Sequence, residues 1–233
     1  MQCVILAGGL ATRLGQITET IPKSMVRIHC RPFLEYQIEL LKRNGIRDIV
    51  LCVGHLSEKI EQYFEDGSRF DVEIRYSREE KGLLGTGGAV KNAERLLDSE
   101  FFLMYGDSYL PIDFAKVLRY FKTRGISACM TVFRNRSLYE KSNVLFKAGI
   151  VEVYDKKTWR PEMEYIDYGL IIVTREVLSR IPPGVPFDLA DLLSELARHR
   201  QLYGYEVYDR FYEIGSIGGL QDFEKCVIEG GRT

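Results

Sequence analysis

The sequence lacks net charge and long apolar runs, and each absence excludes a class of protein. Its 32 Lys and Arg residues nearly balance 33 Asp and Glu residues, which leaves a formal charge of −1. No overall field attracts nucleic acid, and no basic anchor to a membrane is indicated. The longest apolar runs, such as residues 4–7 and 169–173, are far shorter than the roughly 20 residues of a membrane helix. No basic segment followed by a long apolar one stands near Met1, so we expect no signal peptide.

Cysteine is also sparse, and its spacing carries no metal or redox signature. The five cysteines are widely separated, odd in number and form no C-x-x-C pair. Cys3, Cys52 and Cys129 lie in apolar runs, where a thiol acts as a small hydrophobic group. We therefore expect structural cysteines and a reducing, cytoplasmic location.

Two common nucleotide-binding motifs are missing. No G-x-x-x-x-G-K-[ST] occurs, which excludes a Walker-type ATPase. No G-x-G-x-x-G follows the first predicted strand, and Gly54-His55 stands where a dinucleotide-binding fold has an acidic residue. The glycine-rich run at residues 85–88 is a partial match that by itself predicts a helix entry.

The 233 residues fit one large domain, and their hydrophobic pattern alternates between short strands and longer helices. The pattern predicts strands at residues 2–6, 48–53, 72–76, 101–105 and 127–133. It predicts helices between them at residues 33–43, 57–64, 86–97 and 114–122. This order is typical of a doubly wound, mostly parallel α/β sheet.

The rhythm of the pattern changes after residue 133. Residues 143–146 and 150–154 flank a glycine turn, which predicts a hairpin. The remaining elements are predicted as a strand at 165–173, a helix at 189–199 capped by Asp188, strands at 204–208 and 212–214, and a helix at 220–228. We expect this part to fold back onto the same sheet as a small β-rich lobe of a single domain.

The first candidate site follows the first predicted strand. That strand leads into residues that let backbone N–H groups approach a ligand closely: Leu6, Ala7, Gly8 and Gly9. Such a backbone nest suits a phosphate group. Arg13, and Lys23 in the run Pro-Lys-Ser-Met, add two positive charges beside it. The combination predicts a polyphosphate site.

The second candidate site is Gly106-Asp107, which ends another apolar strand. This position lies at the carboxyl edge of the predicted sheet, where open α/β proteins bind ligands. Gly106 permits close approach of a ligand, and Asp107 offers the hard oxygen that Mg²⁺ prefers. Taken alone, Asp107 is better explained as a cap for the following loop. Glu213 has a similar context, and the two carboxylates together predict a shared Mg²⁺ site.

These segments together resemble the sugar-1-phosphate nucleotidyltransferases, also called nucleotide-sugar pyrophosphorylases. Their signature L-A-G-G-x-G-T-R-L followed by P-K-x-[ML] matches residues 6–14 and 22–25, with Ala11 in place of a glycine. The resemblance continues through residues 84–89, Gly106-Asp107 and residues 213–216, and so spans the chain. It is nearest the short guanylyltransferases for heptose 1-phosphate and uridylyltransferases for N-acetylmuramate 1-phosphate.

The resemblance implies a reaction and a role for each charged residue. A sugar 1-phosphate attacks the α-phosphorus of an NTP in line and pyrophosphate leaves, which requires charge neutralisation rather than a protein nucleophile. By resemblance, Arg13 holds the β- and γ-phosphates and Lys23 contacts the α-phosphate. Asp107 and Glu213 bind Mg²⁺, with Glu213 standing where the family usually has Asp.

The remaining implied residues divide between the two substrates. Residues 6–9 with Thr86, Gly87 and Gly88 bind the nucleotide, in a half that spans about 1–133. The sugar phosphate is held in a half that spans about 134–233, where Lys156 grips the phosphate. The acceptor is further lined by Gly106, Asp155, Asp167 and Gly169. Without the resemblance, the segments around Lys156 and Asp167 would be interpreted as solvated surface. Asp155 and Asp167 depart from the usual family residues, which implies an acceptor other than the common hexoses.

Several alternatives stay open at this point. GTP is favoured over UTP on subgroup likeness alone. A CTP-dependent cytidylyltransferase for an alcohol phosphate shares the N-terminal signature. A catalytically silent nucleotide-sugar sensor is disfavoured because Arg13, Lys23 and Asp107 are all retained. The subgroup also implies a cytoplasmic supply of nucleotide sugars for cell-surface polysaccharides.

Overall fold

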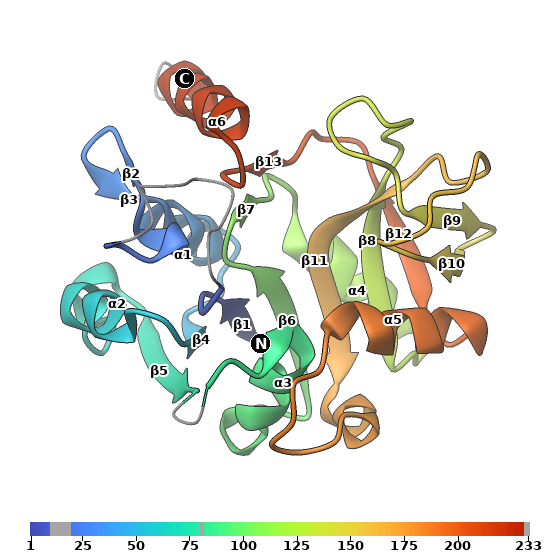
Figure 1. Ribbon diagram of the computed structural model, residues 1–233, viewed down its shortest axis with the longest axis horizontal. Coiled ribbons are helices and arrows are strands. Elements are labelled where there is room, and N and C mark those ends of the chain that lie inside the picture. The colour runs from blue at the N-terminus through green and yellow to red at the C-terminus, as the bar shows by residue number, and fades with distance from the viewer. Residues whose placement is uncertain (10–19, 80–81, 231–233) are drawn as a thin grey trace.

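The computed structural model describes residues 1–9, 20–79 and 82–230. Within these ranges one nine-stranded sheet crosses the whole molecule, with strands in the order β5-β4-β1-β6-β11-β8-β12-β10-β9. In that order the strands are Glu73–Arg78, Asp48–Val53, Gln2–Leu6, Glu100–Tyr105, Ile166–Thr174, Ala128–Phe133, Tyr203–Val207, Ile150–Tyr154 and Val144–Lys147. Figure 1 shows the sheet with helices on both of its faces. The expected α/β class with a mixed, mostly parallel sheet is confirmed.

The directions of the strands divide the sheet into a parallel part and a mixed part. β5, β4, β1 and β6 are parallel neighbours, as the alternating pattern predicts. β11 then inserts antiparallel between β6 and β8, although it follows β8 in sequence. The predicted hairpin forms as β9 and β10 at the far edge of this same sheet. The β-rich part of the chain therefore continues the sheet of the nucleotide half.

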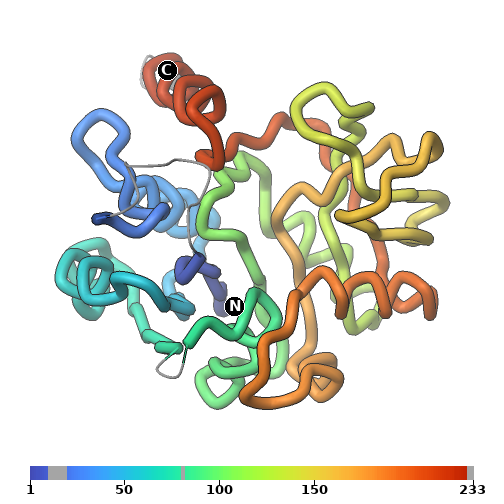
Figure 2. The backbone as a smooth tube through the Cα atoms, viewed as in Figure 1, coloured from blue at the N-terminus to red at the C-terminus, as the bar shows by residue number. Residues whose placement is uncertain are grey.

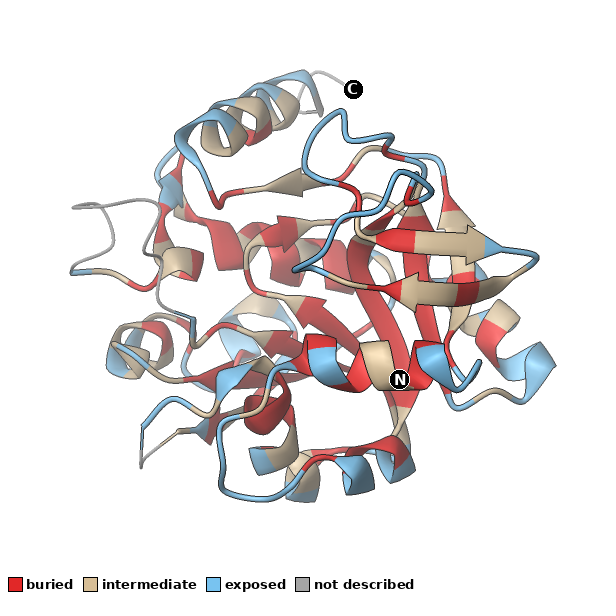
Figure 3. Cartoon of the chain, turned by 45° about the vertical axis from the view of Figure 1, so that its right-hand side comes forward, coloured by how far each residue is buried: buried red, intermediate tan, exposed pale blue. Residues whose placement is uncertain are grey.

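The strands are buried on both faces because helices cover both sides. Along β1, Cys3 and Ile5 join the apolar cluster of one face, while Val4 joins that of the other. The first face is covered by α1 (Phe33–Arg43), α2 (Ser57–Phe64) and α4 (Phe114–Arg124). The second is covered by α3 (Gly85–Asn92) and α5 (Leu189–Arg198). Figure 3 shows buried residues concentrated in these central strands.

A third apolar cluster fixes the C-terminal helix α6 (Ile217–Gly230). The Phe223 ring lies with its centroid 5.0 Å from the centroids of Phe33 and of Tyr109. Tyr109 belongs to β7 (Ser108–Tyr109), which pairs antiparallel with β13 (Tyr212–Glu213) outside the main sheet. The remaining short elements are β2 (Arg27–Ile28), β3 (Arg31–Pro32) and the 3-10 turns η2 (Lys23–Met25), η3 (Ser68–Phe70), η4 (Glu94–Leu96) and η5 (Arg175–Arg180). None of the helices described here is long and apolar enough to cross a membrane.

We expect Gly106→Ala to destabilise the protein by about 1–3 kcal/mol, the usual cost of overpacking a tight site. A Cβ atom at this position would lie 2.4 Å from the carbonyl oxygen of Leu6, and backbone cannot move aside as a flexible side chain can. The matched control is Gly218→Ala, where no atom lies within 4 Å of the added Cβ. The control should leave stability unchanged or raise it slightly, because Ala favours helix more than Gly. Urea denaturation measures both, and equal stabilities would contradict the packing account.

Candidate active site at two adjoining cavities

Two cavities of similar size open side by side at the carboxyl edge of the parallel strands. The first measures about 420 Å³ and the second about 410 Å³. Thr86, Tyr105 and Asp107 line both of them, so the cavities share one wall. This edge is where open α/β sheets bind ligands, because the loops that leave neighbouring parallel strands spread apart there.

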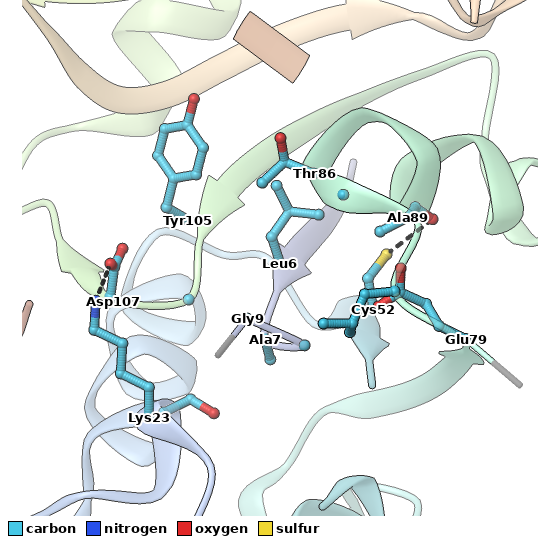
Figure 4. Close-up of a pocket in the computed structure, with 15 residues that line it drawn as sticks. Leu6, Ala7, Gly9, Lys23, Cys52, Glu79, Thr86, Ala89, Tyr105 and Asp107 are labelled. Carbon is cyan, nitrogen blue, oxygen red and sulfur yellow. Dashed lines mark hydrogen bonds and ion pairs between the residues drawn. The ribbon is translucent and has the colours of Figure 1, made fainter. Parts of the chain in front are cut away.

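The first cavity collects most residues predicted to bind the nucleotide. Its lining includes five residues that were predicted to bind the nucleotide: Leu6, Ala7, Gly8, Gly9 and Thr86. The predicted Lys23, Gly106 and Asp107 line it as well. They meet because β1 and β6 are parallel neighbours whose carboxyl ends reach the same edge. Figure 4 shows Lys23 and Asp107 on one side of the segment from Leu6 to Gly9, and Glu79 on the other.

Lys23 and Asp107 form an ion pair at the wall between the cavities. The Lys23 Nζ atom lies 2.5 Å from Asp107 Oδ2, and the two side chains are 17% and 31% exposed. Ser108 donates its hydroxyl to Asp107 Oδ1 at 3.3 Å. η2 carries Lys23 to this place from a loop that is distant in sequence. The pair joins the predicted phosphate-binding cation to the predicted metal-binding carboxylate.

Glycines let the backbone segments of the first cavity approach one another. The N–H of Gly106 donates to the carbonyl of Leu6 at 3.0 Å, and no side chain fits between them. A Cβ on Gly8 would lie 2.9 Å from the backbone nitrogen of Gly54. Gly106 thus lines the first cavity beside β1, and its predicted contact with the acceptor stays a prediction.

Gly87 and Gly88 are not among the residues that line the two cavities, although Gly85, Thr86 and Ala89 beside them line the first, and their role in a base pocket stays a prediction. Their N–H groups donate to the carbonyl of Phe187 at 2.9 and 3.0 Å. A Cβ on Gly87 would meet the Phe187 ring, so these glycines let α3 pack against the segment before α5. Figure 2 shows that segment running beside α3. Thr86 does line both cavities, but its hydroxyl donates to Asp188 at 2.8 Å and accepts the N–H of Leu189.

The second cavity gathers the remaining predicted acceptor residues, Asp155, Lys156, Asp167 and Gly169, together with Glu213. Asp167 is held there by two tyrosines. Tyr154 and Tyr105 donate their hydroxyls to Asp167 Oδ2 at 2.9 and 3.1 Å. Burial, followed by the negative charge of Asp167, holds the pKa of both tyrosines well above the usual value, so both remain donors.

Lys156 lies against this hydrogen-bonded group. Its Nζ atom is 3.4 Å from the Tyr105 hydroxyl and 4.6 Å from the centroid of the Tyr105 ring. It forms no ion pair with a carboxylate in the part of the chain described. An ammonium held on an aromatic face and facing a polar cavity is available to an anionic ligand.

Asp155 and Gly169 shape the backbone around this cavity. Asp155 Oδ1 accepts the N–H groups of Lys157 and Thr158 at 2.8 and 2.9 Å, and these bonds lower the pKa of its carboxyl. Gly169 has a φ of +105°, which L side chains rarely adopt, beside a register shift in the β11–β8 pairing. Both residues thus shape the backbone of the cavity that they line, and their contact with a ligand stays a prediction.

Glu213 reaches Asp107 through the β7–β13 pairing. Glu213 is paired with Ser108, and the N–H of Ile214 donates to the carbonyl of Asp107 at 2.9 Å. Burial raises the pKa of Glu213 to about 7, with further contributions from a hydrogen bond to Glu140 and from the charge of Asp107. Glu213 and Glu140 therefore lie together in the second cavity, and Asp107 is near enough for its charge to act on Glu213.

The carboxylates offer few ligands to a metal ion. No group of three or more Asp, Glu, His or Cys side chains suited to a metal occurs among the residues that the structure describes. Asp107 and Glu213 remain as the two predicted ligands. This number fits Mg²⁺, which takes one or two protein carboxylates and completes its shell with phosphate and water.

Several site residues escaped the sequence analysis, and Arg13 lies outside the described residues. Tyr105 belongs to the shared wall, Glu79 lines the first cavity, and Glu140 with Trp159 lines the second. Tyr105 could have been found from its place beside Gly106-Asp107. No sequence signal marks Glu79, Glu140 or Trp159, because ordinary surface residues look the same.

Comparison with known proteins identifies the family. The model of the nucleotidyl transferase family matches residues 2–156. The D-glycero-alpha-D-manno-heptose 1-phosphate guanylyltransferase of Campylobacter jejuni is 30% identical over 92% of this chain and 95% of its own. The UTP–glucose-1-phosphate uridylyltransferase of Synechocystis is 32% identical over 97% of this chain, which spans only 62% of that relative. Mannose-1-phosphate guanyltransferase of Gibberella zeae is 28% identical, with 61% of its length covered.

Solved structures agree at the level of the fold. HddC from Yersinia pseudotuberculosis, in complex with GMP-PN, superposes with a TM-score of 0.82 at 24% identity over 97% of this chain and 99% of that one. A UDP-glucose pyrophosphorylase in complex with UDP-glucose gives a TM-score of 0.79 at 20% identity, with 98% of each chain covered. The family match and the similarity of the C. jejuni relative over nearly its whole length lead to one conclusion: the chain belongs to the nucleotidyl transferase family.

Proposed function

We propose that the protein transfers a nucleotidyl group from an NTP to a sugar 1-phosphate, giving an NDP-sugar and pyrophosphate. The observation that carries this proposal is the pair of adjoining cavities that meet at Asp107 and the Lys23 ammonium. The glycine-lined first cavity suits a nucleotide. The polar second cavity suits a sugar 1-phosphate, because Lys156 there pairs with no carboxylate among the described residues. Two relatives that match over most of this chain are named for transfer to a sugar 1-phosphate, which supports the assignment.

The proposed reaction brings two anions together at the shared wall. An oxygen of the sugar 1-phosphate attacks the α-phosphorus, the bond from this phosphorus to the bridging oxygen breaks, and pyrophosphate leaves with that electron pair. Lys23 is assigned to the α-phosphate, Lys156 to the acceptor phosphate, and Arg13 to the leaving pyrophosphate. These cations act by positioning and by neutralising charge, which is the main form of catalysis in such transfers.

We assign Asp107 and Glu213 as the residues that would hold Mg²⁺. The fit is supported by geometry, because the pairing of Glu213 with Ser108 and the bond from the Ile214 N–H to the Asp107 carbonyl bring the two carboxylate-bearing segments together. When bound, the ion would neutralise charge on the phosphates. Asp107 pairs with Lys23 in the absence of a metal ion. With Mg²⁺ at Asp107, the Lys23 ammonium would be available to a phosphate.

GTP is the proposed nucleotide, and Glu79 favours it. Its carboxylate lies at the end of the first cavity opposite Lys23, and Oε1 accepts the N–H of Leu84 at 2.7 Å. No cation pairs with Glu79 within the described ranges, and burial raises its pKa. Guanine presents two adjacent N–H donors to such a carboxylate, whereas uracil presents one donor between two carbonyl oxygens. UTP remains the second candidate, since one of the similar relatives is a uridylyltransferase.

A heptose 1-phosphate or a related sugar 1-phosphate is the proposed acceptor, after the C. jejuni relative. The second cavity offers carboxylates for sugar hydroxyls and the indole of Trp159, which is 44% exposed, for the ring. An alcohol phosphate with CTP, and a silent sensor, are the rivals. We further propose that the enzyme supplies nucleotide sugars in the cytoplasm for cell-surface polysaccharides.

The proposal is tested with the purified protein and a matrix of four NTPs against several sugar 1-phosphates and choline phosphate. Pyrophosphate release is measured for each pair, with Mg²⁺ present and with EDTA. We expect release only when NTP, sugar 1-phosphate and metal are all present, and fastest with GTP. Release with choline phosphate and CTP alone would support the cytidylyltransferase, and no release with any pair would support the sensor.

We expect Asp107→Asn to lower kcat by about two orders of magnitude or more, the scale of losing one preorganised charge. The amide keeps the shape of the side chain but neither holds a metal ion nor balances Lys23. The control is Asp71→Asn at an exposed carboxylate, 67% accessible and paired only at the surface. Steady-state kinetics at saturating Mg²⁺ measure both variants, and near-normal turnover of Asp107→Asn would contradict the assignment.

Lys156→Ala should raise KM for the sugar 1-phosphate about 10- to 100-fold, the worth of one charge-assisted hydrogen bond. KM for the NTP should stay nearly constant, because Lys156 lines only the second cavity. Lys157→Ala is the matched control, since the next lysine is 83% exposed and pairs with Asp191 instead. Varying each substrate in turn separates the two constants. A loss confined to the NTP would mean that the acceptor site has been assigned to the wrong cavity.

Glu79→Gln should reduce the preference for GTP over UTP about tenfold or more, as expected for a bidentate base contact worth ~1–3 kcal/mol. The amide oxygen can still accept the N–H of Leu84, so the loop keeps its support. Glu58→Gln, at an exposed position of α2, serves as the control. The ratio of kcat/KM for the two nucleotides is the readout. An unchanged ratio would leave base selection to other groups.

A further inference from the structure

Ser24 carries a buried hydroxyl that has no hydrogen-bond partner. The residue is 1% exposed and stands between Lys23 and Met25 in η2. Its Oγ atom is completely covered and finds no donor or acceptor in the structure described. Nearly all buried polar groups in proteins are hydrogen-bonded, so an orphan hydroxyl needs an explanation.

The position of the Ser24 hydroxyl supplies an explanation, because Ser24 lines the first cavity. The turn around it is held by backbone bonds from Met25 to Pro22 at 2.8 Å and from Val26 to Lys23 at 3.1 Å. These bonds form between backbone groups, and the Ser24 hydroxyl takes no part in them. A donor held in place beside a cavity is prepared for an acceptor that arrives with the ligand.

The neighbouring charge indicates which acceptor fits. Lys23, the adjacent residue, brings its ammonium to the same cavity and is 17% exposed. A hydroxyl donor next to a lysine matches a phosphoryl oxygen, which accepts several hydrogen bonds and carries negative charge. Asp107 alone would repel that oxygen, but its ion pair with Lys23 offsets the repulsion.

We propose that Ser24 donates its hydroxyl hydrogen to a phosphoryl oxygen of the bound NTP. The inference rests on the proposed function and adds a residue to it: Lys23 supplies charge, and Ser24 fixes the orientation of the phosphate. Binding of the nucleotide would then satisfy the one hydroxyl of the turn that folding leaves without a partner.

The test uses a signature that a structural serine would not give. Ser24→Ala removes a group that is unsatisfied without ligand, so its Tm without ligand should equal or exceed that of the wild type. With GTP and Mg²⁺, or with UTP and Mg²⁺, the rise in Tm should be smaller for the variant. KM for the NTP should rise about tenfold, while KM for the sugar 1-phosphate stays within twofold. Inorganic tripolyphosphate, tested in place of the NTP, should show the same loss of stabilisation, since it offers the phosphates alone.

Ser77→Ala is the matched control. Ser77 is also buried, at 5% exposure, but its Oγ accepts the amide of Asn92 at 3.0 Å and it lines neither cavity. This variant should lose Tm without ligand and keep the full rise with NTP. Ser24→Ala is thus expected to reduce the rise in Tm on NTP binding, whereas Ser77→Ala is expected to reduce the Tm without ligand.

Two results would overturn the inference, and they are distinguishable. If the wild type gains Tm with an NTP and releases pyrophosphate, but Ser24→Ala gains equally and keeps its KM, Ser24 has no role and the proposed function stands. If none of the four nucleotides GTP, UTP, CTP and ATP raises the Tm of the wild type, and no pyrophosphate is released, the proposed function fails. The inference then fails with it.

Discussion

The close approach of two backbones at the ends of β1 and β6 is the constraint on which the site depends. Gly106 lies against the carbonyl of Leu6 with no room for a side chain. This contact brings the loop after β1 and the carboxylate of Asp107 to one edge of the sheet. The backbone carbonyl of Asp107 in turn accepts the N–H of Ile214, so the strand that carries Glu213 is attached at the same point. Parts of the chain more than a hundred residues apart thus meet at a single junction.

The negative charge at this junction is neutralised in part without ligand. Asp107 pairs with the Lys23 ammonium at 2.5 Å, while Glu213 and Glu140 line the second cavity beside it. Lys156 stays on the face of Tyr105 without a carboxylate of its own among the described residues. Two anionic substrates entering from opposite cavities would each find a lysine, and their meeting point would lie beside Asp107. Bringing like charges together is the physical difficulty of such a transfer, and this arrangement addresses it.

Much of the fold could be predicted from the sequence, because local signals agreed with tertiary structure. β1, β4, α1 and α2 have the predicted bounds, since their apolar periodicity coincides with burial. The insertion of β11 between β6 and β8 could not be predicted, because no local pattern specifies which strand pairs with which. The pairing of β13 with β7 outside the main sheet escaped prediction for the same reason.

The residues that line the first cavity could be predicted where they follow a strand, as Gly8 follows β1 and Asp107 follows β6. Glycine alone was an ambiguous signal, because Gly87 and Gly88 also let α3 pack against Phe187, which needs glycine whether or not a ligand binds nearby. Glu79 and Ser24 gain meaning only from the cavity around them, and no pattern in the sequence distinguishes them from other polar residues.

The most direct test of the central claim, that the two cavities take the two halves of one reaction, is a crystal structure with an NDP-sugar product and Mg²⁺. The account predicts the base in the first cavity near Glu79, the sugar in the second near Lys156 and Asp167, and the diphosphate across the shared wall beside Lys23 and Asp107. A product lying wholly within one cavity, or with base and sugar exchanged, would contradict it.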